Sequence, residues 1–322
     1  MAKTVHARRT LSYLLSFTLI VPVLTTATDI DSGAKEILTR YLAIPHPKGP
    51  SKTDAYDPKT DKEVNEARQT RLAILAELKA MPADAVSVAE QAIFVSASPE
   101  QRYEIVGFLA EIHTDQCAKL LYRVLQDVRN PENEDESLYE ELVRSSAVHG
   151  LRMMARRADR SGGKRILNGS EFDPAVPGLV PYLIFAASDK AKRVRVNALY
   201  ALADSRDPLA VTELKHRLKD NSEKVRLYAA CFLTEYQDAA GLPEILKSLS
   251  RLRETDSRSP EHNFDYYMQM EMVLASLERI TGKSFGEIPL NPLLVSSPHE
   301  EAQRYKELLD TWHAWWIWQP DY

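Results

Sequence analysis

The stretch that decides the fold reads Val194-Arg195-Val196-Asn197-Ala198-Leu199-Tyr200-Ala201-Leu202. Its pattern returns 31 positions later as Val225-Arg226-Leu227-Tyr228-Ala229-Ala230-Cys231-Phe232-Leu233. A second apolar set repeats with the same period: Val180, Leu183 and Ala187; Val211, Leu214 and Leu218; and Leu242, Ile245 and Leu249. Steps of three and four residues are typical of one face of an α-helix. Each unit of 31 residues is therefore predicted to fold as two amphipathic helices joined by short turns.

A single pair of such helices cannot bury both of its apolar faces, so neighbouring pairs are expected to stack into an elongated all-α array. The arginine of the repeat marks the register of successive units at Arg71, Arg102, Arg144, Arg195 and Arg226, and Met270 stands at the mark of a sixth unit. The array is thus expected to occupy residues 64–286. A loop and a capping helix are expected in residues 287–322, with the helix at about Glu300–Trp318.

Residues 28–63 are expected to lie outside the array. Asp31–Ala43 has the composition of a short helix, whereas Ile44–Lys62 holds four prolines among charges and indicates an extended linker. Residues in excess of the period predict loops at three places: the acidic tract Pro131–Glu136, the segment Arg156–Pro174, and about Ser250–His262.

These motifs resemble a known repeat family. The Val-Arg-x-x-Ala-x-x-Ala-Leu helix, the Asp207-Pro208 turn and the Leu-x-x-x-Leu second helix are similar to the short HEAT-like repeats of the phycobilisome-lyase type. The tail, Leu-x-Arg-Ile-Thr-Gly-Lys-x-Phe-Gly followed by a Trp-rich helix, resembles the end of many exported bacterial HEAT-repeat proteins. The resemblance covers roughly residues 64–318 and implies a right-handed α-solenoid of about six HEAT-like helix pairs.

The first 27 residues have the features of a signal peptide. Lys3, Arg8 and Arg9 precede the apolar run Leu11–Leu24, and Thr25-Thr26-Ala27 supplies small residues for cleavage. The alternative is an uncleaved membrane anchor, but the run is shorter than the roughly 20 residues that a spanning helix needs, and it contains Ser12, Ser16 and Pro22. We therefore expect export to a periplasm or cell envelope with cleavage after Ala27, and contact with the membrane only through this segment before cleavage.

Charge and cysteine content exclude some functions. Removal of residues 1–27 takes away three of 41 basic residues and none of the 46 acidic ones, so the net charge becomes 38 − 46 = −8. An acidic chain lacks the phosphate-neutralising charge of a general nucleic-acid binder, and no specific nucleic acid is expected. Cys117 and Cys231 lie several repeats apart, which favours two buried thiols over a disulfide.

The repeated arginines have a structural and a functional interpretation. In this fold type an arginine at the mark pairs with the aspartate in the turn of the preceding repeat, and Asp207 stands ready for Arg226. We therefore assign Arg144, Arg195, Arg226 and Asp207 to a structural ladder between layers. The functional alternative is that these repeated arginines form a row that binds an anion.

Two further clusters are candidates for binding. The first is basic and comprises Arg156, Arg157, Arg160, Lys164, Arg165, Lys190, Lys192 and Arg193. It would suit an acidic partner or polyanion, unless its charges form a solvated loop offset by the acidic residues of Glu132–Glu141. The second is aromatic. Trp312, Trp315 and Trp316 share one helical face and are assigned to a cap over the last repeat, with Trp318 left exposed.

Nothing in the sequence marks an active site. His-x-x-x-His, Cys-x-x-Cys, nucleophile-elbow and phosphate-loop spacings are missing, so neither catalytic residues nor a metal or cofactor is expected. HEAT-like hydroxylases place His-Glu pairs in several repeat helices, and the one such pair here, His299-Glu300, lies outside the repeats. The sequence favours a non-catalytic interaction or scaffold module with a protein partner of unknown identity. The alternatives are an enzyme or enzyme subunit of the bilin-lyase kind, and a polyanion-binding module that uses the basic cluster.

Overall fold

The computed structural model describes residues 32–44, 58–78, 82–127, 129, 134–155, 166–167, 170–171, 178–254, 264–289 and 298–318. The helices in this part of the chain are α1 (Ser32–Leu42), α2 (Pro58–Leu78), α3 (Pro82–Gln91), α4 (Pro99–Leu109), α5 (Asp115–Gln126), α6 (Glu134–Ala155), α7 (Val180–Ala186), α8 (Lys192–Ser205), α9 (Pro208–Arg217), α10 (Glu223–Glu235), α11 (Leu242–Glu254), α12 (Phe264–Thr281) and α13 (Pro298–Ile317). A π-helical turn, η1 (Ala92–Ser96), follows α3, and a 3₁₀ turn, η2 (Ala239–Gly241), precedes α11. The expected all-α class is confirmed in these residues, apart from one small hairpin.

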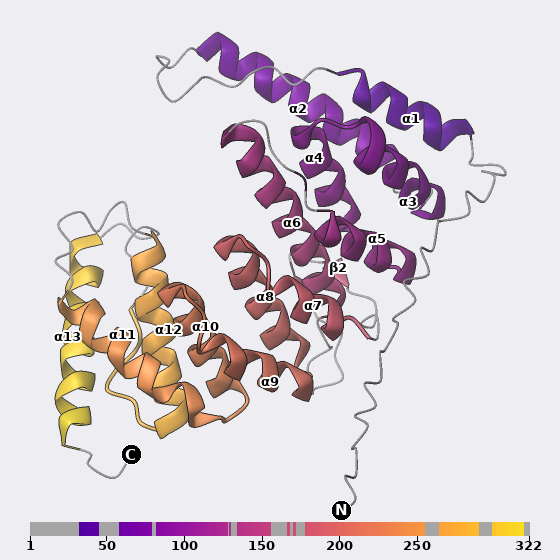
Figure 1. The fold of residues 1–322 in the computed structure, drawn as a ribbon. Helices are drawn as coiled ribbons and strands as arrows, with labels where there is room; N and C mark the ends of the chain where they lie inside the picture. Colours follow the sequence, from indigo (N-terminus) through magenta and orange to yellow (C-terminus); the bar gives the residue numbers. More distant parts are fainter. Residues whose placement is uncertain are drawn as a thin grey trace, which may run out of the picture.

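The helices pack in sequence as two layers. In the first layer α4, α6, α8, α10 and α12 each contact the next. In the second layer α3 contacts α5, α7 contacts α9, and α11 contacts α13. Each second-layer helix from α5 to α11 also packs on the first-layer helix that follows it in the chain. Figure 1 shows that this array follows an arc, with α6, α8 and α10 along its inner side and α5, α7 and α9 along its outer side. The arrangement is solenoid-like.

Helix starts follow local capping rules. The Ser98 side chain and Gln101 form a capping box at the start of α4, and Pro99 takes the first helical position. Thr114 caps α5 by accepting a hydrogen bond from the backbone N–H of Cys117. Asp207 caps α9 in the same way through the N–H of Leu209. Short polar residues therefore set the turns between layers.

Close helix packing depends on two glycines. A Cβ added at Gly241 would lie 2.5 Å from the Cα of Ala230 on α10, a distance that real Cβ atoms do not adopt. A Cβ at Gly150 on α6 would lie 2.9 Å from the Cα of Ala110. In both places the backbone of one element touches the next without room for a side chain.

The buried core is divided at α10. One cluster of buried apolar residues runs from Ala34 to Leu233, and a second runs from Leu227 to Trp312. Helix α10 contributes Val225 and Phe232 to the first cluster and Leu227 and Cys231 to the second. It is therefore the element that joins the two parts of the core.

The C-terminal helix differs from the expected cap in its position. Helix α13 contacts α11 as well as α12, so it continues the second layer and completes the last pair (Figure 1). The sixth pair is thus α12 with α13, and the expected extra capping helix is the second helix of that pair. Among the described helices, none is both long and apolar enough to span a membrane.

Several expected boundaries were wrong. Helix α2 begins at Pro58, inside the segment expected to be linker, and α6 begins at Glu134, inside the acidic tract expected to be loop. Acidic residues stabilise a helix N-terminus through the helix dipole, which explains why a charged tract is helical. Within the expected loop Arg156–Pro174, β1 (Ile166–Leu167) pairs antiparallel with β2 (Ser170–Glu171). The short helix expected at Asp31–Ala43 is confirmed as α1.

Candidate functional site

The register arginines are buried and paired. Arg71 donates to both carboxylate oxygens of Glu104 at 2.8 Å, and Arg102 lies between Asp127, at 2.8 Å, and Glu140. Arg144 reaches Asp189 at 2.8 Å. Arg71, Arg102 and Arg144 are each at most 2% exposed. The described arginines at these marks therefore hold successive repeats together.

Arg195 joins two turns at once. Its guanidinium donates to the backbone carbonyls of Asp189 and Lys190 in the preceding turn, at 2.9 and 3.1 Å. It also donates to side-chain oxygens of Asp220 and Asn221 in the following turn, at 2.9 and 3.0 Å. One side chain thus connects the start of its own repeat to the start of the next.

The expected partner of Arg226 was wrong. Arg226 donates to Glu244 on α11 at 3.2 Å and to the carbonyl oxygen of Asp220 at 2.9 Å, while Asp207 caps α9. In the repeats of Arg144 and Arg195 the acid comes from the following turn, not the preceding one. The 31-residue recurrence of Asp189 and Asp220 was the sequence signal for this pairing.

The basic cluster falls largely outside the described residues. Arg156, Arg157, Arg160, Lys164 and Arg165 lie there, so nothing is placed for them. Lys190, Lys192 and Arg193 are exposed at the start of α8. Arg193 forms an ion pair of 3.0 Å with Glu141, at the end of the acidic stretch that was expected to offset the cluster.

The tryptophans divide by burial. Trp312 is fully buried in the second core cluster with Tyr305 and Val273, and its ring meets Phe285 edge-on with centroids 4.8 Å apart. Trp315 and Trp316 are partly buried. Trp318 is 80% exposed, as expected. Of the three rings on this helix face, Trp312 is therefore the most deeply buried.

The two cysteines behave as buried apolar residues. Neither forms a disulfide, and burial raises the pKa of each thiol to about 12. In the part of the chain that the structure describes, His, Cys, Asp and Glu form no group of three or more that could hold a metal ion.

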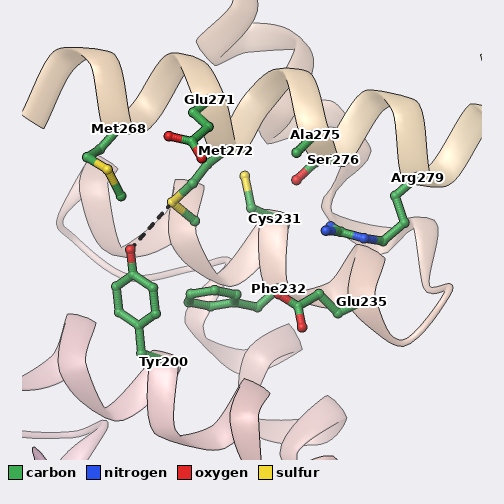
Figure 2. A pocket seen from close by; sticks show the side chains of 10 residues that line it. All are labelled: Tyr200, Cys231, Phe232, Glu235, Met268, Glu271, Met272, Ala275, Ser276 and Arg279. Atoms are coloured by element: carbon green, nitrogen blue, oxygen red, sulfur yellow. Dashed lines mark hydrogen bonds between the residues drawn. The ribbon is translucent and has the colours of Figure 1, made fainter. Parts of the chain in front are cut away.

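A pocket that sequence reasoning missed lies between three first-layer helices (Figure 2). Its volume is about 210 Å³. Tyr200 comes from α8, and Cys231, Phe232 and Glu235 come from α10; α12 contributes Met268, Glu271, Met272, Ala275, Ser276 and Arg279. Aromatic rings, thioethers and small side chains form the lining, and charged groups stand around it.

Contacts within the pocket fix its apolar wall. The Tyr200 hydroxyl donates to the Met272 sulfur at 3.8 Å, and the Tyr200 ring meets that of Phe232 with centroids 4.8 Å apart (Figure 2). The Arg152 guanidinium lies over the Tyr200 ring, 5.0 Å from its centroid. Burial raises the pKa of the Tyr200 phenol. The Tyr200 phenol is therefore neutral, and its ring is held in place by Met272 and Phe232 on one side and by Arg152 on the other.

The charged groups of the pocket differ in their partners. Glu235 pairs with Arg206 at 2.8 Å, so its charge is offset. Arg279 donates to the hydroxyl of buried Thr234 at 2.9 Å. Among the described residues, Arg279 forms no ion pair with a carboxylate, whereas Arg152, which lies over the Tyr200 ring, pairs with Asp204 at 2.6 Å. Glu271 is exposed on the same helix.

Comparisons with known proteins add little. No protein-family model matches the chain, and no curated protein matches it. One similar solved structure is human deoxyhypusine hydroxylase in complex with glycerol, at 18% sequence identity and a TM-score of 0.26, covering 87% of this chain and 96% of that chain. At that TM-score the likeness carries no argument about fold or activity.

Proposed function

We propose that this chain is a non-catalytic interaction or scaffold module of a bacterial cell envelope and is exported to the periplasm. We further propose that it binds a protein partner on its first layer, which lies along the inner side of the arc and is called the inner layer below. The signal-like features of residues 1–27 support the address. The stacked helix pairs support a binding role, because such arrays present a long surface whose side chains do not hold the fold together. A right-handed, HEAT-like repeat of the phycobilisome-lyase type is part of the same proposal.

The observation that carries the proposal is the pocket on α8, α10 and α12. It presents Tyr200, Phe232, Met268 and Met272 together on the first layer. Aromatic residues and methionine are enriched where proteins bind one another, and methionine adapts its shape to different partners. The register arginines Arg71, Arg102 and Arg144 are buried in ion pairs within the array, so they offer no competing surface for an anion.

Affinity purification tests the function. The full mature chain would be tagged and recovered from envelope extracts of its native cells beside an otherwise identical Ala275→Phe variant, in which a ring fills the pocket. We expect the native chain to recover one protein in an amount nearly equal to its own, and the Ala275→Phe variant to recover none of that protein. Leu209→Phe is the matched control, because Leu209 is 60% exposed on α9 in the outer layer. Equal recovery of the same protein by native chain and pocket variant would refute binding on this surface.

A further inference from the structure

We propose that the pocket on α8, α10 and α12 takes one large apolar side chain from an extended segment of a partner protein, and that Arg279 pairs with an acidic residue of that segment. The inference rests on the proposed function, because it names the chemistry by which the inner layer recognises its partner. It goes beyond that function by fixing the sequence character of the segment.

The size of the pocket argues for a side chain as the occupant. Sites for whole small molecules are typically about 300–1,000 Å³, and this one is about 210 Å³. Tyr200, Phe232 and Met272 form an apolar wall for an aliphatic or aromatic group. Ala275 and Ser276 leave the space open because their side chains are short (Figure 2).

Arg279 is held in place for an anion. Its guanidinium donates to the Thr234 hydroxyl at 2.9 Å, and that hydroxyl donates to the Cys231 carbonyl at 2.7 Å. Thr234 is 1% exposed, so the bond anchors Arg279 to the interior of α10. A guanidinium has five N–H donors, and a neutral hydroxyl accepts one of them. The remaining donors suit a carboxylate, which binds arginine through two parallel hydrogen bonds.

The pocket lining also holds a carboxylate on the same helix as Arg279. Glu271 is exposed eight residues before Arg279 on α12, which places the two Cα atoms about 12 Å apart along the helix. In Figure 2 Glu271 lies beside Met272, between Met268 and Cys231, and Arg279 lies beyond Ser276 along the same helix. An extended segment covers about 12 Å in roughly four residues. The favoured segment therefore carries a basic residue, an apolar anchor near its middle, and an acidic residue.

The test uses defined probes and the full mature chain. The first probe is the capped peptide Lys-Ala-Phe-Ala-Asp, and two others replace its Phe with Ala or its Asp with Asn. The chain would carry ¹³C only in the methionine methyl groups, so that Met268 and Met272 report from the pocket by NMR. Met154 and Met270 do not line the pocket, and their side chains are only 2% and 3% exposed, so they serve as internal controls.

We expect the first probe to shift the Met268 and Met272 resonances and to leave those of Met154 and Met270 unchanged. Loss of the Phe ring should abolish the shifts. Arg279→Gln should weaken binding of the Asp probe about fivefold, the upper range for a partly exposed ion pair. It should leave binding of the Asn probe unchanged. Lys247→Gln, which removes an exposed cation from α11, should change neither.

The proposal fails if the Ala probe shifts the pocket methyl groups as the Phe probe does, or if Arg279→Gln weakens the Asp and Asn probes equally. Its failure is distinguishable from that of the proposed function. A partner captured equally by native chain and Arg279→Gln would leave the interaction module standing and refute the role of Arg279. Absence of any captured partner, with the probes behaving as expected, would retain the pocket chemistry and refute the scaffold.

Discussion

Arg195→Ala is the most informative substitution in the arginine ladder that holds successive repeats together. The guanidinium makes four hydrogen bonds that join two successive turns. After its removal, Asp220 keeps the backbone N–H of Ser222 at 2.8 Å and Arg217 at 3.9 Å, with its side chain 5% exposed. The substitution therefore leaves a buried carboxylate without its main cation.

The size of the effect follows from that burial. Removing one partner of a buried ion pair costs about 3–5 kcal/mol, because the remaining charge stays in a medium of low polarity. Arg193→Ala is the matched control, since Arg193 and Glu141 have side chains 53% and 29% exposed. An exposed pair contributes about 0–1 kcal/mol. Both variants remove one arginine from α8, so the comparison isolates burial.

Urea denaturation followed by circular dichroism at 222 nm would give the free energy of unfolding, after a check that the transition is two-state. Asp220→Ala would complete a double-mutant cycle with Arg195→Ala. We expect Asp220→Ala to cost much less in the Arg195→Ala background than in the native chain. Equal costs for Arg195→Ala and Arg193→Ala, or additive costs in the cycle, would refute the ladder.

Three other outcomes can be measured on the same material. Trp312→Ala should lower the free energy of unfolding by about 3–5 kcal/mol, whereas Trp318→Ala should leave it nearly unchanged because that ring is 80% exposed; equal effects would contradict the packing of α13. Burial raises the pKa of the Cys117 and Cys231 thiols to about 12, whereas the thiols of the unfolded chain have a pKa of about 8.5. Their contribution to the free energy of unfolding is therefore complete below about pH 8.5 and is lost as the pH rises toward about 12. The thiols of the folded chain should accordingly not react with Ellman's reagent at pH 8 until denaturant is added. Rapid labelling of the folded chain would contradict the burial of both thiols. N-terminal sequencing of native material should begin at Thr28, and an intact Met1 would contradict export.

The sequence predicted the layers well because burial follows helical spacing. Positions such as Val194, Ala198 and Leu202 recur at steps that place them on one helix face, and all three are fully buried. The ladder partners were predicted less well. Asp189 and Asp220 each stand five residues before the Val of a register helix, a recurrence that reports the pairing as clearly as the arginines do. The expectation for Arg226 came from family resemblance, and the recurrence does not supply its partner either, because position 251, 31 residues after Asp220, is an arginine and Arg226 pairs with Glu244.

The pocket has no local signal in the sequence. Tyr200 and Met272 are 72 positions apart and meet because α8 and α12 both pack on α10. Methionine and tyrosine at helical spacing also fit an ordinary core, so only the packed structure separates lining from core. The place of α13 was missed for a related reason. Its apolar face fits either an end cap or a second-layer helix, and contact with α11 decides between them.

The most direct test of the central claim is site-specific photo-crosslinking in native cells. A photoreactive benzoylphenylalanine would replace Met268 at the edge of the inner-layer pocket, and in a matched chain it would replace Leu209 on the outer layer. We predict one discrete protein adduct from position 268 that disappears when Ala275→Phe is added, and no adduct of that mass from position 209. Adducts of the same mass from both positions, or none from position 268, would contradict binding of a protein partner on the inner layer.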